Sequence, residues 1–179
     1  ESFNHYQQTQ AWTWEHQALV RARVILGQDE LRARFAQIRK EILCAPRDVD
    51  TLKQDVLKMR EKMRTHLAKG NSEQFDLKQD VGAMTDIEFI TQYLVLKNAN
   101  QFSQLTVFSD NVRILTDAAA IGCITKTQKQ QLIQAYIDYR SRYHVLSLNQ
   151  QGRLVSRKEY QTDIESVTAC WNAIFELEA

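Results

Sequence analysis

The sequence predicts an all-α protein, folded as a single bundle of seven or eight helices. One Pro and five Gly are few for 179 residues, while Leu, Ala, Gln, Lys, Arg and Glu are abundant, as is typical of helical chains. Apolar residues also recur at spacings of three and four along most of the chain, which is the period of an amphipathic helix. A chain of this length buries about two thirds of its unfolded surface in one core, so we expect one domain over residues 1–179.

The N-terminal part is expected to contain a short polar lead-in over residues 1–10 and then three amphipathic helices. Gly27 is a stop signal for the first of them, and Pro46 ends the second. Each helix has an apolar stripe that faces the core. The three helices are expected over residues 11–26, 29–43 and 50–69.

Basic residues on the third helix have two interpretations. Lys53, Arg60 and Arg64 fall on one face of it, and charges at helical spacing are typical of a solvated surface. The alternative is that Arg60 and Arg64, one turn apart, bind a phosphate or the acidic face of a partner. Arg60 and Arg64 are therefore the candidate partner-binding residues.

Periodicity is lost near residues 70–84, where we expect one irregular loop. The alternation of Phe75 and Leu77 suggests a short strand or hairpin arm within it. Beyond the loop, Thr85 and Glu88 have the spacing of a capping box, and Asp86 and Glu88 fall in a first helical turn, where the macrodipole favours carboxylates.

The C-terminal half is predicted to hold the most buried helices. The helix over residues 86–100 is apolar on nearly all sides and belongs at the centre of the bundle. A further helix runs from Ser109, its expected cap, to Gly122. Two more capping boxes, Thr125 with Gln128 and Ser156 with Glu159, open the last two helices, whose aromatic stripes are typical of core rather than of a base-stacking surface.

Composition argues against several functions. A formal charge of +1 gives no bulk attraction to nucleic acid or to a membrane surface, and no apolar run approaches the roughly 20 residues of a membrane span. Three widely spaced cysteines favour reduced thiols, and the N-terminal residues lack the basic-then-apolar order expected of a signal peptide. We therefore expect a cytoplasmic protein with neither nucleic acid nor membrane as a partner.

No motif for independent catalysis is found. The sequence has no nucleophile elbow, no glycine-rich phosphate loop and no pair of His at i, i+4. One acidic cluster could bind Mg²⁺ through oxygen ligands, although carboxylates in a loop are also commonly solvated. Its members are Asp76, Asp80, Asp86 and Glu88.

Four ungapped motifs resemble one family. They are WEHQALVRAR at 14–23, MREKMR at 59–64, FDLKQDVGAMTDIEFITQYLVL at 75–96 and SDNVRIL at 109–115. Their order covers essentially the whole chain and is similar to the C-terminal end of the bacterial glutamine synthetase adenylyltransferases. The resemblance implies a helical domain that follows the adenylylating nucleotidyltransferase domain of a large bifunctional enzyme, so that the catalytic domain lies upstream of these residues.

The resemblance also implies an activity. Enzymes of this family transfer AMP from ATP, with Mg²⁺, to a tyrosine of glutamine synthetase, and glutamine and the PII signalling protein set the direction of the reaction. Their metal-binding carboxylates form an Asp-x-Asp motif after a Gly-Ser pair, which this sequence lacks. We therefore expect no catalytic residue, no metal ligand, no bound cofactor and no activity in this chain by itself.

Residues near the nucleotide can be suggested only by that resemblance. Arg21 and Arg23 would lie near the ATP phosphates or in an interdomain salt bridge, and the loop before Phe89 would lie at the cleft. In this loop Gly82-Ala83 replaces the usual Gly-Gly, and the Cβ of Ala83 disfavours a positive φ. The candidate residues are Arg21, Arg23, Asp76, Lys78, Asp86 and Glu88. The alternative function is a purely structural or protein-binding helical module.

Overall fold

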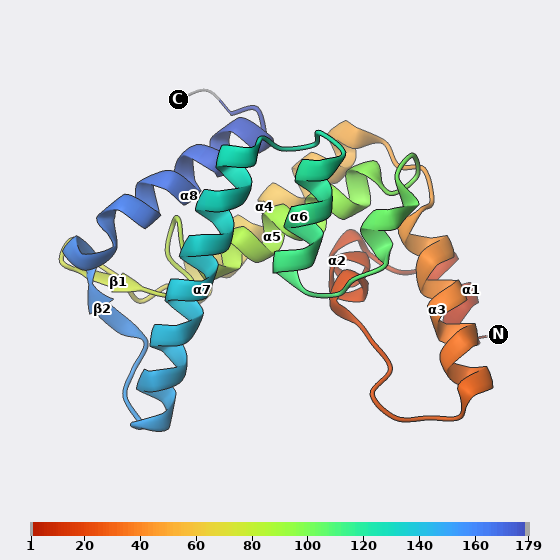
Figure 1. Cartoon of the computed structure of the whole chain (residues 1–179), viewed down its shortest axis with the longest axis horizontal. Helices are drawn as coiled ribbons and strands as arrows, with labels where there is room; N and C mark the ends of the chain where they lie inside the picture. The colour runs from red at the N-terminus through yellow and green to blue at the C-terminus, as the bar shows by residue number, and fades with distance from the viewer. Residues whose placement is uncertain (1, 178–179) are drawn as a thin grey trace. The chain divides into compact units, whose positions relative to one another are not determined.

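The computed structural model describes residues 2–177, and most of them are helical (Figure 1). The all-α prediction is confirmed: within these residues there are eight α-helices, and the strands are limited to two of three residues each. No helix in this range is long and apolar enough to cross a membrane. The helices are α1 (Ser2–Thr9), α2 (Thr13–Arg21), α3 (Asp29–Leu43), α4 (Val49–Leu67), α5 (Met84–Asn98), α6 (Asn111–Ala120), α7 (Lys126–Leu148) and α8 (Gln161–Ile174).

The chain divides into two compact units. The first unit is formed by Glu1–Val56 and Thr91–Cys123, and the second by Leu57–Ile90 and Ile124–Ala179. Helices α4 and α5 therefore each contribute residues to both units. The single domain expected over residues 1–179 stays a prediction.

The first unit is built from α1, α2, α3, α6, the 3₁₀ helix η1 (Ser103–Thr106) and the adjoining parts of α4 and α5. Helix α3 packs against α1, α2 and η1. Helix α6 is capped by Asp110, whose side chain accepts from the Arg113 N–H, rather than by Ser109 as expected. The buried residues of this core include Leu19, Val20, Ile38, Ile42, Leu43, Leu52, Val56, Val95, Leu105, Ile114 and Leu115.

The first amphipathic helix is shorter than predicted. It ends at Arg21, and Ala22 is already extended, so that Ile25 and Leu26 are 82% and 88% exposed instead of buried. At this end of the helix, Arg39 on α3 donates from Nε to the Leu19 carbonyl and from Nη2 to the Val20 carbonyl. The Leu19 carbonyl also accepts from the Ala22 N–H, so Arg39 caps carbonyls at the C-terminal end of α2 that have no further helical amides to bind.

The second unit combines α7 and α8 with a small antiparallel ladder. Strand β1 (Gln74–Asp76) pairs with β2 (Leu154–Ser156), with Phe75 opposite Val155. The strand expected around Phe75 is therefore present. The Phe75 ring lies 5.5 Å from the ring of Tyr139 on α7, and both side chains are buried, so the ladder belongs to the core of this unit.

Of the three predicted capping boxes, one is confirmed. Thr125 and Gln128 cap α7 reciprocally. Ser156 is the last residue of β2, and the 3₁₀ helix η2 (Arg157–Tyr160) precedes α8. The predicted Ser156–Glu159 box at the start of α8 is therefore wrong. The Thr85–Glu88 box is also wrong because α5 already begins at Met84, and the buried Thr85 Oγ1 has no hydrogen-bond partner.

Candidate functional site

Three buried aspartates hold the irregular segment between α4 and α5. Each one pairs with an arginine of the second unit: Asp86 with Arg60 at 2.5 Å, Asp76 with Arg153 at 2.8 Å, and Asp80 with Arg157 at 3.1 Å. All three carboxylates are less than a tenth exposed. We call these six residues the aspartate–arginine network; they are Arg60, Asp76, Asp80, Asp86, Arg153 and Arg157.

Asp76 shapes the turn after β1. One carboxylate oxygen accepts from the backbone N–H groups of Lys78 and Gln79 at 3.0 and 3.1 Å, and the other accepts from the N–H of Lys69 at 3.2 Å. An aspartate that accepts from the backbone two and three residues further on forms an Asx-type turn. Asp76 thus orders the loop, and Lys78 takes part through its backbone.

Asp86 joins the loop to α4 and α5. Its Oδ2 accepts from the Gly82 N–H at 2.7 Å, and its Oδ1 accepts from Arg60 Nε at 2.5 Å and from Arg64 Nη2 at 3.5 Å. A carboxylate at the start of a helix also interacts favourably with the macrodipole. Asp86 therefore replaces Thr85 as the side chain that stabilises the start of α5.

Arg60 is buried, so the solvated position expected for it is wrong. Its side chain is 1% exposed, and its Nη2 donates to the Gln79 and Asp80 carbonyls at 2.8 and 3.3 Å. Its guanidinium carbon also lies 5.9 Å from the centre of the Phe89 ring. Of the two candidate partner-binding residues, Arg64 alone reaches solvent, with 24% of its side chain exposed.

Two glycines of the loop allow this close packing. A Cβ on Gly70 would lie 1.7 Å from the Asp80 carboxylate, and a Cβ on Gly82 would lie 2.7 Å from the Ile164 carbonyl. Gly82 has a positive φ of 78°, whereas Ala83 does not. Ala83 therefore fits at this position, because the left-handed conformation falls on Gly82.

The predicted nucleotide-proximal residues fall into different units. Arg21 donates to Asn111 Oδ1 and belongs to the first unit, as does the exposed Arg23. Asp76 and Asp86 are part of the buried network of the second unit, where Lys78 and Glu88 are half-exposed. The structure thus joins Asp76 and Asp86 with Arg60 and Arg64 in one cluster.

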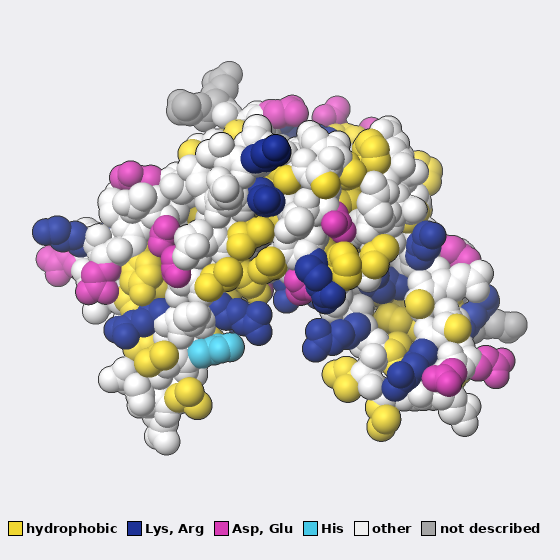
Figure 2. Space-filling model, viewed as in Figure 1, with side chains coloured by type: hydrophobic (Ala, Val, Ile, Leu, Met, Phe, Trp, Pro, Cys, Tyr) yellow, Lys and Arg dark blue, Asp and Glu magenta, His cyan; other side chains and the backbone are white. Residues whose placement is uncertain are grey.

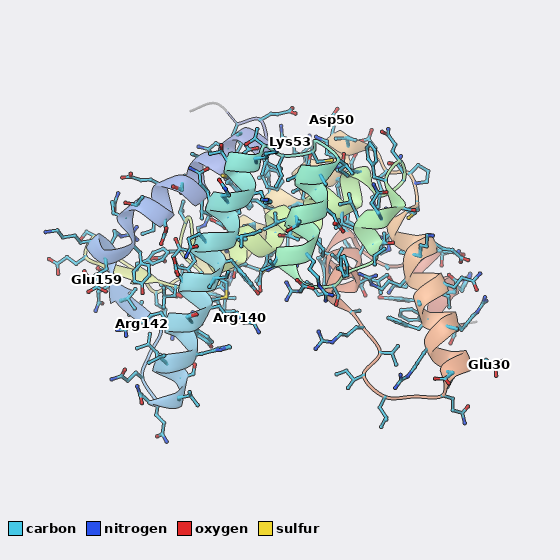
Figure 3. The ribbon with its side chains drawn as sticks, in the orientation of Figure 1. Glu30, Asp50, Lys53, Arg140, Arg142 and Glu159 are labelled. Atoms are coloured by element: carbon cyan, nitrogen blue, oxygen red, sulfur yellow. The ribbon has the colours of Figure 1, made fainter. Side chains whose placement is uncertain are left out.

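The second unit also has charged residues that the network does not use. Arg140 and Arg142 project from α7 and Glu159 from η2 (Figure 3), and all three are exposed. They are solvated surface charges. The charges that fix the loop are the buried ones, and sequence reasoning missed Arg153 and Arg157 because their partners are 77 residues away.

The network is suited to holding a shape rather than to binding a metal. Each of its carboxylates already has an arginine partner, and among residues 2–177 no group of three or more His, Cys, Asp or Glu could hold a metal ion. Of the candidate residues around the loop, those with a partly exposed side chain are Lys78 in the loop, Arg64 on α4 and Glu88 on α5.

Comparison with known proteins identifies the class. A family model described as GlnD PII-uridylyltransferase matches residues 50–171, and one described as glutamate-ammonia ligase adenylyltransferase matches residues 1–38. Both descriptions are of nucleotidyltransferases. The chain, with its all-α fold and buried network, is therefore a helical part of a protein of that class.

Individual relatives make the assignment more specific. The chain is 47% identical over 175 residues to the bifunctional glutamine synthetase adenylyltransferase/adenylyl-removing enzyme of Pasteurella multocida (strain Pm70), and 46% identical to that of Idiomarina loihiensis. These matches cover 98% of the chain but 18% of each relative. The chain belongs to the glutamine synthetase adenylyltransferase family.

Proposed function

We propose that the chain is the helical domain of an enzyme that transfers AMP from ATP to a tyrosine of glutamine synthetase. The observation that carries the proposal is the 46–47% identity along 98% of the chain to proteins named for that activity. The domain packs against a nucleotidyltransferase domain outside these residues and helps to form its cleft or to dock glutamine synthetase. The intact enzyme acts in the cytoplasm and responds to the PII signalling protein.

The chemistry of the chain supports an accessory role. Nucleotidyl transfer needs a metal ion that bridges the phosphates and neutralises developing charge. The buried aspartates do not fit such an ion, because Asp76, Asp80 and Asp86 already have arginine partners. The carboxylates that hold Mg²⁺ in the intact enzyme are therefore those of the catalytic domain.

An exposed apolar segment supports packing against that domain. Between α2 and α3 of the first unit, Ile25 and Leu26 are almost fully exposed, and Leu31 on α3 is 63% exposed. Figure 2 shows hydrophobic side chains at the surface over this segment. Large apolar side chains that lie close together at a surface are typical of an interface, so this segment is the proposed contact with the catalytic domain.

An add-back experiment tests the proposal. The catalytic domain is prepared alone and with this chain, and the transfer of AMP from labelled ATP to glutamine synthetase is measured. We expect the catalytic domain to be at least tenfold slower alone and to recover when the chain is added, because positioning contributes strongly to such reactions. Full activity of the catalytic domain alone would support the alternative, a structural or protein-binding module that contributes nothing to the active site.

A further inference from the structure

A basic cavity lies in the first unit, apart from the aspartate–arginine network. It has a volume of 610 Å³ and is lined by residues of α3, of η1 and of the segments that follow α2 and η1. Four of the lining residues are cations: Arg23, Arg32, Arg39 and Lys40. None of the described residues that line it is Asp or Glu. Neither Asp29 nor Glu30 in the first turn of α3 is among them (Figure 3 labels Glu30).

The buried member of the four is Arg39. It is 8% exposed, and its four hydrogen bonds all go to backbone carbonyls, those of Leu19, Val20, Thr106 and Phe108. A guanidinium has five N–H donors, so one of them stays unused in these bonds. Burial lowers the pKa of Arg39, which means that its positive charge is held in the protein at a cost.

This buried cation forms no ion pair with any described residue. Among the salt bridges of residues 2–177, none involves Arg39. The four carbonyl bonds stabilise this buried charge, but only an opposite charge would compensate it in full. An anion in the adjoining cavity would supply that compensation.

The other three cations that line the cavity are accessible to solvent. Arg23, Arg32 and Lys40 are exposed, and Figure 2 shows Lys and Arg side chains beside hydrophobic ones over this part of the first unit. Arginine binds phosphate oxygens in a bidentate manner, and lysine binds them as a point charge. Three accessible cations around one buried cation suit an anion with several charges.

The remaining walls are partly apolar. Val24, Phe35 and Val107 line the same cavity, and Val107 is 68% exposed. A volume of 610 Å³ falls within the range of small-molecule sites, which combine apolar walls with a few polar anchors. A flat aromatic base can lie on such walls while its phosphates reach the cations.

We propose that this cavity binds a nucleoside triphosphate, with Arg32, Arg23 and Lys40 on the phosphates above Arg39, and Val24, Phe35 and Val107 against the base. This inference differs from the expectation drawn from the sequence that the chain binds no nucleotide by itself. It concerns binding by the chain alone and does not depend on the proposed AMP transfer, which can hold or fail independently.

The test is calorimetric titration of the full 179-residue chain with ATP in EDTA, so that no metal ion contributes. Arg32→Ala is compared with Arg34→Ala: both side chains are exposed on α3, but only Arg32 lines the cavity. We expect Arg32→Ala to weaken ATP binding about tenfold, the loss of one charge-assisted hydrogen-bonded contact. Arg34→Ala should stay within about twofold, because exposed charges outside the site are screened by salt.

A second variant and a second ligand complete the experiment. Lys40→Ala should also weaken binding, and it avoids the bond from Arg32 to the Ile25 carbonyl, while circular dichroism checks that each variant is folded. Inorganic triphosphate should bind more weakly than ATP because it lacks the base. The proposal is overturned if ATP does not bind the wild-type chain, or if Arg34→Ala weakens binding as much as Arg32→Ala. Equal affinity for ATP and triphosphate would overturn the assignment of the apolar walls.

Discussion

Arg60 and Asp86 form the most buried ion pair of the described chain, with side chains 1% and 2% exposed. Removing one member of such a pair leaves the other buried and uncompensated. In this case Asp86 would also keep its position against the Gly82 N–H while losing its strongest cationic partner. Substitution within this pair is therefore the most sensitive single-residue test of the aspartate–arginine network.

We predict that Arg60→Ala lowers the free energy of unfolding by about 3–5 kcal/mol, the usual cost of breaking a buried pair. Arg64→Ala, on the same helix and also beside Asp86 but partly exposed, should cost less than about 1 kcal/mol. Urea unfolding followed by circular dichroism measures both. Equal losses for the two variants would contradict the structure of the network.

The residues of the candidate site could be predicted only in part. The sequence marks Asp76 and Asp86 because they interrupt the helical period, but it does not show their partners. Arg153 and Arg157 join the network through a ladder between β1 and β2, and nothing local to either arginine indicates this. The spacing of Arg60 and Arg64 suggests a surface face, whereas folding of the loop over α4 buries Arg60.

At the scale of elements, His16 connects α2 with α1 and with Arg47 in the segment before α4. His16 lies near the middle of α2: Nε2 is 3.0 Å from the Gln7 carbonyl, and Nδ1 is 3.4 Å from Arg47 Nη2. These contacts fit a neutral ring with its proton on Nε2. Burial lowers the pKa of His16, and the charge of Arg47 lowers it further, against the hydrogen bond to Gln7.

This lowered pKa predicts a pH dependence of stability. Above the unfolded-state value of about 6.5, His16 is neutral in both states and its contribution is complete. As the pH falls below that value towards the lower folded pKa, the unfolded state takes up the proton first, so stability is lost. We expect His16→Gln to reduce the fall in unfolding free energy between pH 7 and pH 5, measured by urea titration at each pH.

The matched control is His144→Gln, since His144 is exposed on α7. It should leave the slope of stability against pH unchanged. If His16→Gln and the wild-type chain lose the same stability between the two pH values, the buried neutral state of His16 is wrong.

Helices are predicted well where their apolar period faces a core, and badly where that period continues past the end of the helix. The apolar spacing of α2 continues through Ile25 and Leu26, but the helix ends at Arg21, where its last carbonyls accept from Arg39, 20 residues from Leu19. Thr125 caps α7 as predicted, but Thr85 and Ser156 have the same local spacing and form no capping box. A signal confined to one turn therefore predicts a cap only where the helix begins at the expected residue.

At the scale of the whole molecule, composition and period are enough to predict an all-α chain. They do not reveal that residues 91–123 return to the first unit, because the apolar stripe of α4 and the apolar surface of α5 indicate burial but not which core each end of the helix meets. The family could be recognised from four motifs, and relatives 46–47% identical support it.

The proposed contact between the first unit and the catalytic domain is made by the exposed segment before α3. Leu26→Asp in the full-length protein tests this contact, with Leu148→Asp as the control. The two leucines are 88% and 85% exposed, and a charge at either should cost this chain little stability. AMP transfer from ATP to glutamine synthetase is the measurement. We predict that Leu26→Asp lowers the transfer rate at least tenfold and that Leu148→Asp leaves it unchanged; an unchanged rate with Leu26→Asp would contradict the account.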